Sequence, residues 1–263
     1  MINKANVLSV IENNYELLPL IRNRVTSVFD KGLHFKYKPI QSIQSYLMQR
    51  ADVIMFPSKA LSYGGMVLYR NGSYYIHINT LQPKTYENFV WAHEFYHFEF
   101  EKERIQSQDE VTFITNPALD TNERMANLFA AELLINSDAL AALFTETCEQ
   151  NTNDPLAINI TRLIPAFELP YKSLVIKLAQ DKLITLEQAQ EIIDFDYLNH
   201  LPKDFDLSII EPSKAIRIDR LNSLLENADS KTTLFDSDIN SIIRIKDQHL
   251  QKLDEIRHKT KEE

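Results

Sequence analysis

The chain has 263 residues with 44% hydrophobic and 25% charged side chains, a single cysteine and a formal net charge of -9. This is an ordinary globular composition, and no apolar run approaches the length of about 18 residues that a membrane span requires. The acidic balance argues against a broad nucleic-acid-binding surface, which is usually basic. The one thiol, Cys148, excludes an internal disulfide and is typical of a reducing cytoplasm, where we expect the protein to reside.

The first part of the chain predicts helices and then a small sheet. Apolar side chains recur every three or four residues in two early segments, and short runs rich in Val, Ile, Tyr and Phe follow. Asn71-Gly72 separates two of these runs, and this dipeptide is typical of the type I′ turn of a β-hairpin. The predicted helices cover about 5–30 and 39–51, and the predicted strands cover 53–56, 66–70 and 73–79.

The segment after the strands contains the most informative motif. Apolar and ring side chains repeat at helical spacing from about 88 to 103, and residues 93–97 read His-Glu-Phe-Tyr-His. Positions four apart share one helix face, so His93 and His97 can both reach one tetrahedral zinc ion. Glu94 then lies beside the metal, where it can accept a proton from the attacking water.

A chance match is the alternative for this pentapeptide. In a chain with seven histidines the motif arises by chance roughly once in a hundred sequences, and two histidines on a helix face need no metal. Two features favour the metal site. The histidines lie on the inward face of the predicted helix, where neutral imidazoles need partners. The hairpin before the helix also offers an edge to which a peptide substrate could add a strand.

The next predicted helix, over about 120–135, supplies a third ligand. Catalytic zinc usually takes three protein ligands and a water. Glu123 and Asn127 lie one turn apart at the edge of the apolar stripe. Glu123 could therefore bind the metal while Asn127 accepts a hydrogen bond from a ligand histidine. The alternative is local, because Asp120 and Glu123 also have the spacing of a capping box at a helix start.

Two sequence blocks resemble the ImmA/IrrE family of bacterial metallopeptidases. The first, within residues 75–97, contains Ile-His-Ile-Asn and then Phe-Val-Trp-Ala-His-Glu-Phe-Tyr-His. The second, residues 123–134, reads Glu-Arg-Met-Ala-Asn-Leu-Phe-Ala-Ala-Glu-Leu-Leu. The resemblance implies a thermolysin-like zinc site, whose residues would be the ligands His93, His97 and Glu123 and the catalytic base Glu94.

Three positions depart from the family pattern. Tyr96 replaces the glycine that often precedes the second histidine, and we expect it to narrow the space beside the helix. Met125 stands where a second acidic residue is frequent, and Asn136 stands where a proline is frequent. These departures concern the substrate pocket and leave the predicted ligands in place.

The reaction also requires a group that stabilises the oxyanion, and the sequence does not choose one. His77 fits a strand histidine on a solvent-facing side better than a catalytic group. The nearby candidates are Tyr63, Tyr69, Tyr74, Tyr75, His77 and Tyr96.

The second half of the chain is predicted to be helical. Residues 157–184 fit a helix, a turn and a second helix that starts after Pro170, and similar pieces follow the peptidase core in some members of the family. Its lysines are countered by nearby acidic residues, so a packing module or a substrate cradle is favoured over DNA binding. A last amphipathic helix, about 238–258, packs on its own domain or against a partner, and the sequence leaves the oligomeric state open.

The predicted fold class is mainly helical α+β, with a small antiparallel sheet packed on the His-Glu-x-x-His helix in a zincin-like core. We expect a metallopeptidase domain at 1–150, a helix-turn-helix-like module at 151–200 and a helical extension at 201–263. The favoured function is a zinc-dependent endopeptidase. By the family resemblance, its substrate is a helix-turn-helix transcriptional repressor, cut to induce a mobile element or a stress response. The alternatives are a zinc-bearing protein that sequesters a partner uncut, and a DNA-binding regulator acting through 157–184.

Overall fold

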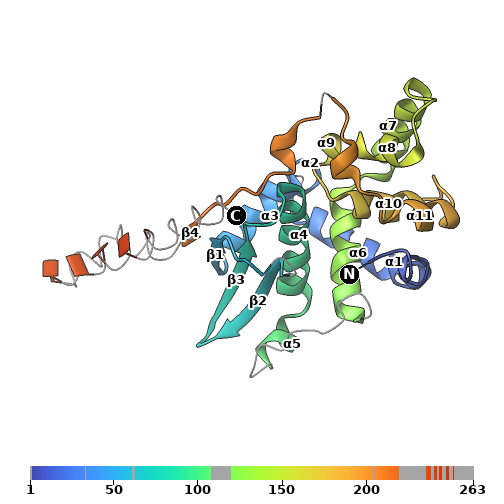
Figure 1. The fold of residues 1–263 in the computed structure, drawn as a ribbon. Helices are drawn as coiled ribbons and strands as arrows, with labels where there is room; N and C mark the ends of the chain where they lie inside the picture. Colours follow the sequence, from blue (N-terminus) through green and yellow to red (C-terminus); the bar gives the residue numbers. More distant parts are fainter. Residues whose placement is uncertain are drawn as a thin grey trace.

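A computed structural model describes most of the chain. The described residues are 2–32, 34–60, 63–107, 120–203 and 205–218, with scattered positions between 235 and 251. A small sheet lies on one side of the molecule and helices form the remainder (Figure 1). The predicted mainly helical α+β class is therefore confirmed.

The sheet is mixed, whereas the sequence predicted a wholly antiparallel one. Its order is β2-β3-β1-β4, with β2 and β3 paired as the predicted antiparallel hairpin. The turn residues Asn71 and Gly72 both have positive φ, as a type I′ turn requires. β1, however, pairs parallel with β3 and antiparallel with β4. The strands are β1 (Asp52–Phe56), β2 (Gly65–Arg70), β3 (Ser73–Asn79) and β4 (Arg217–Ile218).

The connection after β1 explains this difference. β2 follows β1 in the chain but lies at the outer edge of the sheet, and β3 returns between these two strands. The second strand of the hairpin therefore runs in the same direction as β1. Hydrophobic alternation specifies that these segments are strands, but it does not specify which neighbour each one takes.

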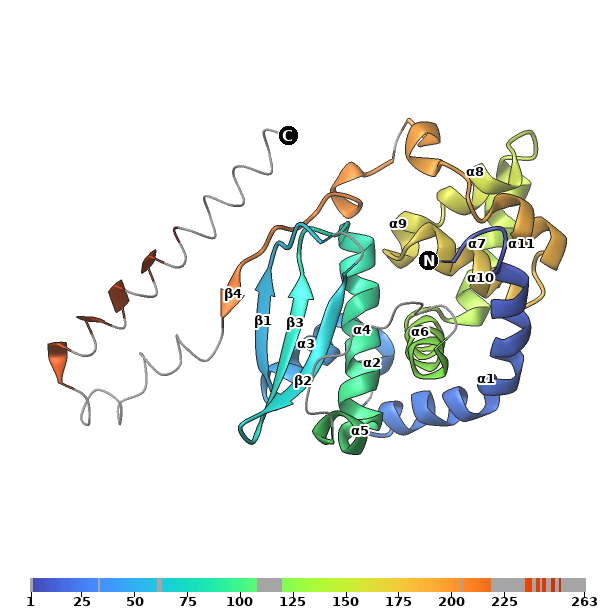
Figure 2. The ribbon, with the colours of Figure 1, turned by 60° about the horizontal axis from the view of Figure 1, so that its bottom comes forward.

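The helices agree closely with the predicted segments. In Figure 2 the sheet, α4, α6 and α1 follow one another across the molecule, and α4 contacts both the sheet and α6. The N-terminal and central helices are α1 (Val7–Phe29), α2 (His34–Tyr37), α3 (Pro39–Met48), α4 (Lys84–Phe100), α5 (Lys102–Gln106), α6 (Thr121–Leu134) and α7 (Ser137–Gln150). The later ones are α8 (Leu156–Thr161), α9 (Ile164–Phe167), α10 (Tyr171–Gln180) and α11 (Leu186–Ile192).

Helix α4 lies in the middle of the first hydrophobic core. Its Trp91 and Phe95 are fully buried, against β3 residues such as Ile76 and α6 residues such as Phe129. Side chains of this size each remove a large apolar area from water, so a displacement of α4 would cost much of the free energy gained by this burial. The core thus holds α4 rigidly between the sheet and α6.

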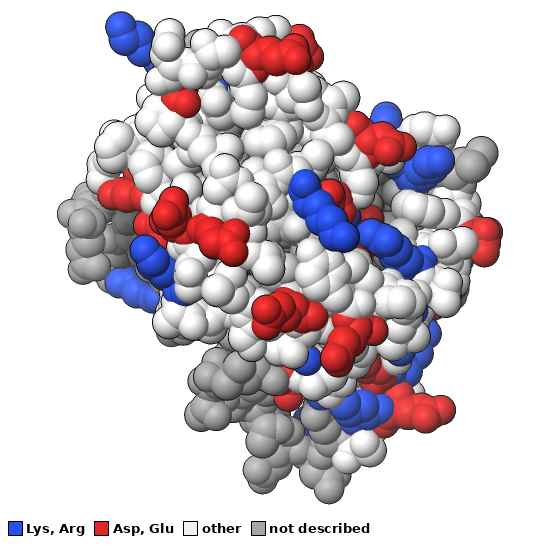
Figure 3. Space-filling model, turned by 90° about the vertical axis from the view of Figure 1, so that its right-hand side faces the viewer, with Lys and Arg blue, Asp and Glu red and all other residues white. Residues whose placement is uncertain are grey.

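A second core joins the early helices to the later ones. It contains residues of α1, α6 and α7 together with α8, α10 and α11. The segment predicted as helix-turn-helix-like contains the three helices α8, α9 and α10, and α10 is buried along most of its length, including Leu174, Val175 and Leu178. Acidic and basic side chains are interspersed over the face of the molecule that Figure 3 shows. The predicted division of the chain at residue 150 stays a prediction.

A segment after α11 crosses the start of α4 and reaches the sheet. The backbone N–H of Lys84 donates to the Glu211 carbonyl at 3.2 Å, and that of Lys214 donates to Thr80 at 2.9 Å. β4 follows directly, and the sequence analysis did not predict this strand. The predicted helix at about 238–258 lies largely outside the described residues.

Over the described part of the chain, no single helix has the length and apolarity to cross a membrane. Helices α6 and α7, bent by 71° at their junction, meet the criteria of length and composition only when taken together as a pair.

Candidate metal centre

Helix α4 brings the two motif histidines together. His93 and His97 are one turn apart on its inward face, and their Nε2 atoms lie 3.1 Å from each other. Only 14% of the His93 side chain and 7% of the His97 side chain are exposed. The helix begins after Pro83, a residue that fits a helix start because it lacks an N–H group. The buried α4 therefore presents two imidazole nitrogens at one point.

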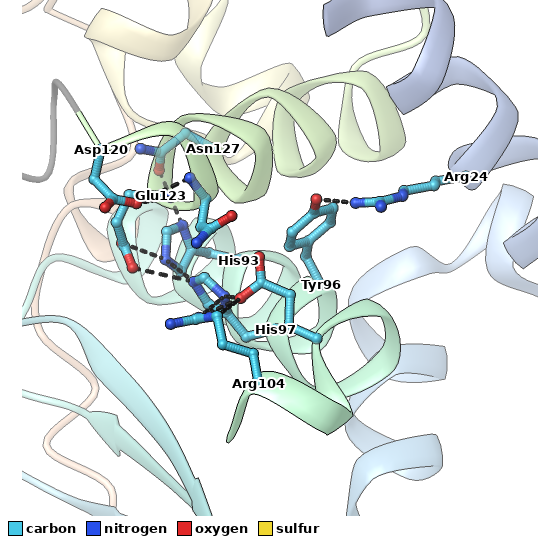
Figure 4. Close-up of polar contacts among 10 residues, drawn as sticks. Arg24, His93, Tyr96, His97, Arg104, Asp120, Glu123 and Asn127 are labelled. Carbon is cyan, nitrogen blue, oxygen red and sulfur yellow. Dashed lines mark hydrogen bonds and ion pairs between the residues drawn. The ribbon is translucent and has the colours of Figure 1, made fainter. Parts of the chain in front are cut away.

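Helix α6 adds a carboxylate at the same point (Figure 4). Glu123 Oε2 lies 3.2 Å from His93 Nε2, and Glu123 Oε1 lies 3.4 Å from His97 Nε2. One potential ligand atom from each of the three residues lies within 4.8 Å of the other two. The three side chains that the sequence predicted as ligands therefore lie together, two on α4 and one on α6.

The remaining nitrogen of each histidine has its own acceptor. His93 Nδ1 lies 3.0 Å from Asn127 Oδ1, as the sequence predicted. His97 Nδ1 lies 2.9 Å from Glu101 Oε2, a contact that the sequence analysis missed. A histidine whose Nδ1–H donates to such an acceptor presents the lone pair of Nε2, and we assign this tautomer from the neighbouring groups. Both lone pairs then face the Glu123 carboxylate.

The donor set fits a divalent metal ion. Two imidazoles and one carboxylate are a ligand set found in zinc hydrolases, in which a fourth position stays open for water or substrate. Two buried Nε2 atoms in contact have no good hydrogen-bonding arrangement with each other when both carry lone pairs. A cation between them and the carboxylate resolves that conflict. His93, His97 and Glu123 would hold such an ion.

Glu94 lies next to this cluster in a tightly packed position. It is only 4% exposed. A Cβ atom added to Gly65 on β2 would come within 2.9 Å of its Oε1, so a glycine at this position leaves room for the carboxylate. The helix and the edge strand of the sheet together determine where this carboxylate lies.

The site shifts the pKa values of its two central carboxyl groups in opposite directions. Burial raises the pKa of Glu94 above its ordinary value, against the opposing effect of His93 and His97. Burial also acts to raise the pKa of Glu123, but its hydrogen bond and charge interactions with the two histidines outweigh burial and lower that pKa. Glu123 is therefore the better anionic ligand, and Glu94 is the better proton acceptor near neutral pH.

The structure places two of the predicted oxyanion candidates away from the centre. Tyr96 is fully buried on the other side of α4, where its hydroxyl contacts Arg24 of α1 (Figure 4). Its ring nevertheless packs edge-on against His97, with 5.8 Å between the ring centroids, and the expectation that Tyr96 narrows the space beside the helix stays a prediction. His77 alternates with Ile76 and Ile78, which face α4, so its side chain lies on the opposite face of the sheet.

Three of the four remaining candidates, Tyr63, Tyr69 and Tyr74, have contacts of their own. The Tyr63 hydroxyl lies 2.6 Å from His77 Nδ1. Tyr74 packs edge-on against Phe98, and Tyr69 packs against Tyr74. These aromatic groups contribute to packing at the sheet and the end of α4.

Tyr86 is a site neighbour that the sequence analysis missed. Desolvation raises its pKa first, and the negative charges of Glu94 and Glu123 raise it further, which places the phenol close to both carboxylates. The side chain is still 37% exposed. Its position seven residues before His93 on the same helix face could have indicated this placement.

A family comparison supports what the geometry indicates. Residues 49–179, about half of the chain, match the IrrE N-terminal-like domain, a metallopeptidase family. The match begins just before β1 and ends in α10, so it contains the whole candidate metal centre. No curated protein and no solved structure gives a match. Through residues 49–179 the chain belongs to the IrrE N-terminal-like family of metallopeptidases.

Proposed function

We propose that the chain is a zinc-dependent endopeptidase with His93, His97 and Glu123 as ligands and Glu94 as the catalytic base. One observation supports this proposal above all others. Three potential ligand atoms converge within 4.8 Å, and the adjacent Glu94 carboxyl group is buried and has a raised pKa. A purely structural metal site has no use for such a group.

Each side chain has a distinct role in this proposal. When bound, the zinc ion polarises the peptide carbonyl and makes water a better nucleophile. Glu94 accepts the proton as the water oxygen bonds to the carbonyl carbon, and it then gives that proton to the amine nitrogen as the C–N bond breaks. Asn127 holds the His93 imidazole in the orientation that a ligand needs. Tyr86 and Tyr63, whose pKa values are both raised by burial and further by the charge of Glu94, are the candidates for a hydrogen bond to the oxyanion.

The sheet edge supports a peptide as the substrate. Among the described strands β2 pairs only with β3, so no described strand occupies the other edge, where a peptide could add one. Gly65, at the start of β2, lies against Glu94, so a peptide paired with this strand would pass close to the base. The proposed substrate, by resemblance to the ImmA/IrrE family, is a helix-turn-helix transcriptional repressor. The proposed location is the cytoplasm, which the single cysteine favours.

The test compares wild type with Glu94→Gln, which keeps the size of the side chain but removes the base. Both purified proteins are loaded with zinc, analysed for metal content and incubated with the repressor encoded beside the gene. We expect equal zinc content and at least about 100-fold slower cleavage by the variant. The matched control is Glu103→Gln, since Glu103 is an exposed glutamate on the short helix after α4. It should cleave as wild type does.

The outcome separates this proposal from its alternatives. Full cleavage by Glu94→Gln would contradict the role of Glu94. A repressor bound intact, with the same biological effect from wild type and Glu94→Gln, would favour a zinc-bearing protein that sequesters its partner.

A further inference from the structure

We propose that Glu101, held by Arg104, is a positioning residue that orients His97 toward the metal and strengthens metal binding. This inference rests on the proposed function, because it concerns the same centre. It assigns a role to a carboxylate outside the predicted ligand set.

The end of α4 places Glu101 beside His97. The helix ends at Phe100, and the backbone N–H of Glu101 still donates to the His97 carbonyl at 3.1 Å. Glu101 therefore lies one turn beyond His97 on the same face. Its Oε2 is 2.9 Å from His97 Nδ1, and only 7% of its side chain is exposed. In so little water, a charged hydrogen bond of this length contributes more than one at the surface.

Arg104 fixes the Glu101 carboxylate in place. The chain turns at Glu101 into α5, which brings Arg104 back toward the centre. Arg104 Nε donates to Glu101 Oε2 at 2.8 Å, and Nη2 contacts the same oxygen. Arg104 Nη2 also lies 3.4 Å from His97 Nδ1. Both partners of Glu101 thus converge on one oxygen, so the rotation of this carboxylate is restricted.

The two histidines differ in the chemistry behind them. His93 is held by the neutral amide of Asn127, whereas His97 is held by the Glu101 carboxylate. A carboxylate that accepts the Nδ1–H increases the electron density of the imidazole and so strengthens the Nε2–metal bond. Arg104 balances the charge of Glu101, which allows this carboxylate to remain buried beside the centre. His97 is therefore expected to be the stronger of the two imidazole ligands.

The test measures zinc affinity by competition with a chromophoric chelator, independently of cleavage. Changing an outer partner of a ligand typically costs about 10–100-fold in metal affinity. We expect Glu101→Ala to bind zinc about 10–100-fold more weakly than wild type. Glu101→Gln keeps the size and one acceptor oxygen, so it should recover part of that loss. The control is Glu103→Gln. Glu103 is exposed on α5, two residues after Glu101, so this variant should bind zinc as wild type does.

A double-mutant comparison tests whether Arg104 acts through Glu101. Arg104→Ala should weaken zinc binding in the wild-type background and change it less than about twofold in the Glu101→Gln background. Thermal unfolding of the metal-free variants shows whether each one folds. Gln occupies the same space as Glu. If Glu101→Ala does not fold, the zinc affinity of Glu101→Gln therefore tests the positioning role of Glu101.

The results separate this inference from the proposed function. Zinc affinities of Glu101→Ala and Glu101→Gln that are both within about twofold of wild type would overturn the positioning role and leave the peptidase proposal intact. Wild-type protein that binds no zinc would overturn the peptidase proposal itself. Arg104→Ala effects of equal size in both backgrounds would show that Arg104 acts on the centre directly, contrary to the inference.

Discussion

The Asp120 side chain accepts a hydrogen bond from the backbone N–H of Glu123 at 3.0 Å, so the residue that caps α6 also holds the turn that presents the candidate ligand. The sequence left two alternatives for this segment, a helix cap or a metal ligand. The cap is made by Asp120, while the Glu123 side chain extends to the two histidines. Only the Asp120 half of the predicted capping box is therefore formed, and the Glu123 side chain is directed to the histidines instead of back to the start of the helix.

Removing this cap should weaken both α6 and the metal centre. Asp120→Ala leaves the first backbone N–H groups of α6 without their acceptor, which costs about 0.5–2 kcal/mol of unfolding free energy. Because Glu123 lies in that first turn, zinc affinity should fall as well. Urea unfolding of the metal-free protein and chelator competition measure the two effects. Asp120→Asn retains a capping oxygen and should stay close to wild type in both measurements. Unchanged stability of Asp120→Ala would show that the cap contributes nothing.

Replacing Gly65 should impair catalysis more than metal binding. The added Cβ of Gly65→Ala would lie 2.9 Å from Glu94 Oε1 and 2.8 Å from Val90 Cγ1, so the base has to move. A displacement of this kind lowers the rate strongly, because proton transfer depends on geometry. We expect cleavage to fall at least about tenfold, while zinc content is retained.

A matched control for this variant is Gly72→Ala in the hairpin turn. A Cβ there meets no atom within 4 Å, but the positive φ of Gly72 makes alanine unfavourable. This control should lose about 1 kcal/mol of stability and keep its cleavage rate. Equal cleavage by Gly65→Ala and wild type would contradict the proposed contact between β2 and the base.

Signals that lie close together in the sequence predicted much of the fold and the site. Asn71-Gly72 predicted the hairpin because its two residues determine the turn themselves. The four-residue spacing of His93 and His97 predicted a shared helix face, which α4 confirms. The prediction of Glu123 as a ligand depended on a second helix, and it was supported by the order of two linked motifs that resemble one family.

Contacts between distant segments could not be predicted in the same way. β4 pairs with β1 across more than half of the chain, and two residues of strand carry no recognisable periodicity. The parallel pairing of β1 with β3 depends on the path of the intervening connection, which leaves the strand pattern unchanged. Glu101 differs from these cases. It stands four residues after His97, so the i, i+4 rule could have identified it.

The buried Lys177 should be essential for stability. Its side chain is fully buried in the second core, where it contacts Glu132 of α6 and lies 3.0 Å from Asp181. Lys177→Met removes the buried cation that both poorly solvated carboxylates share, which typically costs about 3–5 kcal/mol. Urea unfolding of the metal-free protein measures this loss.

The double variant Lys177→Met/Glu132→Gln is the control for this prediction. It removes the charge of Glu132, the more buried of the two carboxylates, together with the lysine, so it should recover part of the lost stability. Arg22 also pairs with Glu132, at 3.0 Å, but from a largely exposed position, so it cannot replace the lysine. Equal stability of Lys177→Met and wild type would show that the buried charges are already solvated or paired by other groups.

His77 should make the stability of the protein fall in mildly acidic solution. Burial lowers the pKa of its imidazole to about 4, against about 6.5 in an unfolded chain. Between these two values the unfolded chain binds a proton that the folded protein does not, so stability decreases as the pH falls from about 6.5 and levels off below about 4. Because the ring is only partly buried, we expect this group to cost about 1–2 kcal/mol between pH 7 and pH 5.

His77→Asn isolates this effect, because asparagine does not titrate and still offers an oxygen to the Tyr63 hydroxyl near the position of His77 Nδ1. Urea unfolding of both metal-free proteins at pH 7 and pH 5 gives the difference. The other titratable groups are present in both proteins and cancel in the comparison. Wild type should lose more stability than the variant on acidification. Parallel losses in the two proteins would mean that the folded protein takes up a proton at His77 as easily as the unfolded chain does.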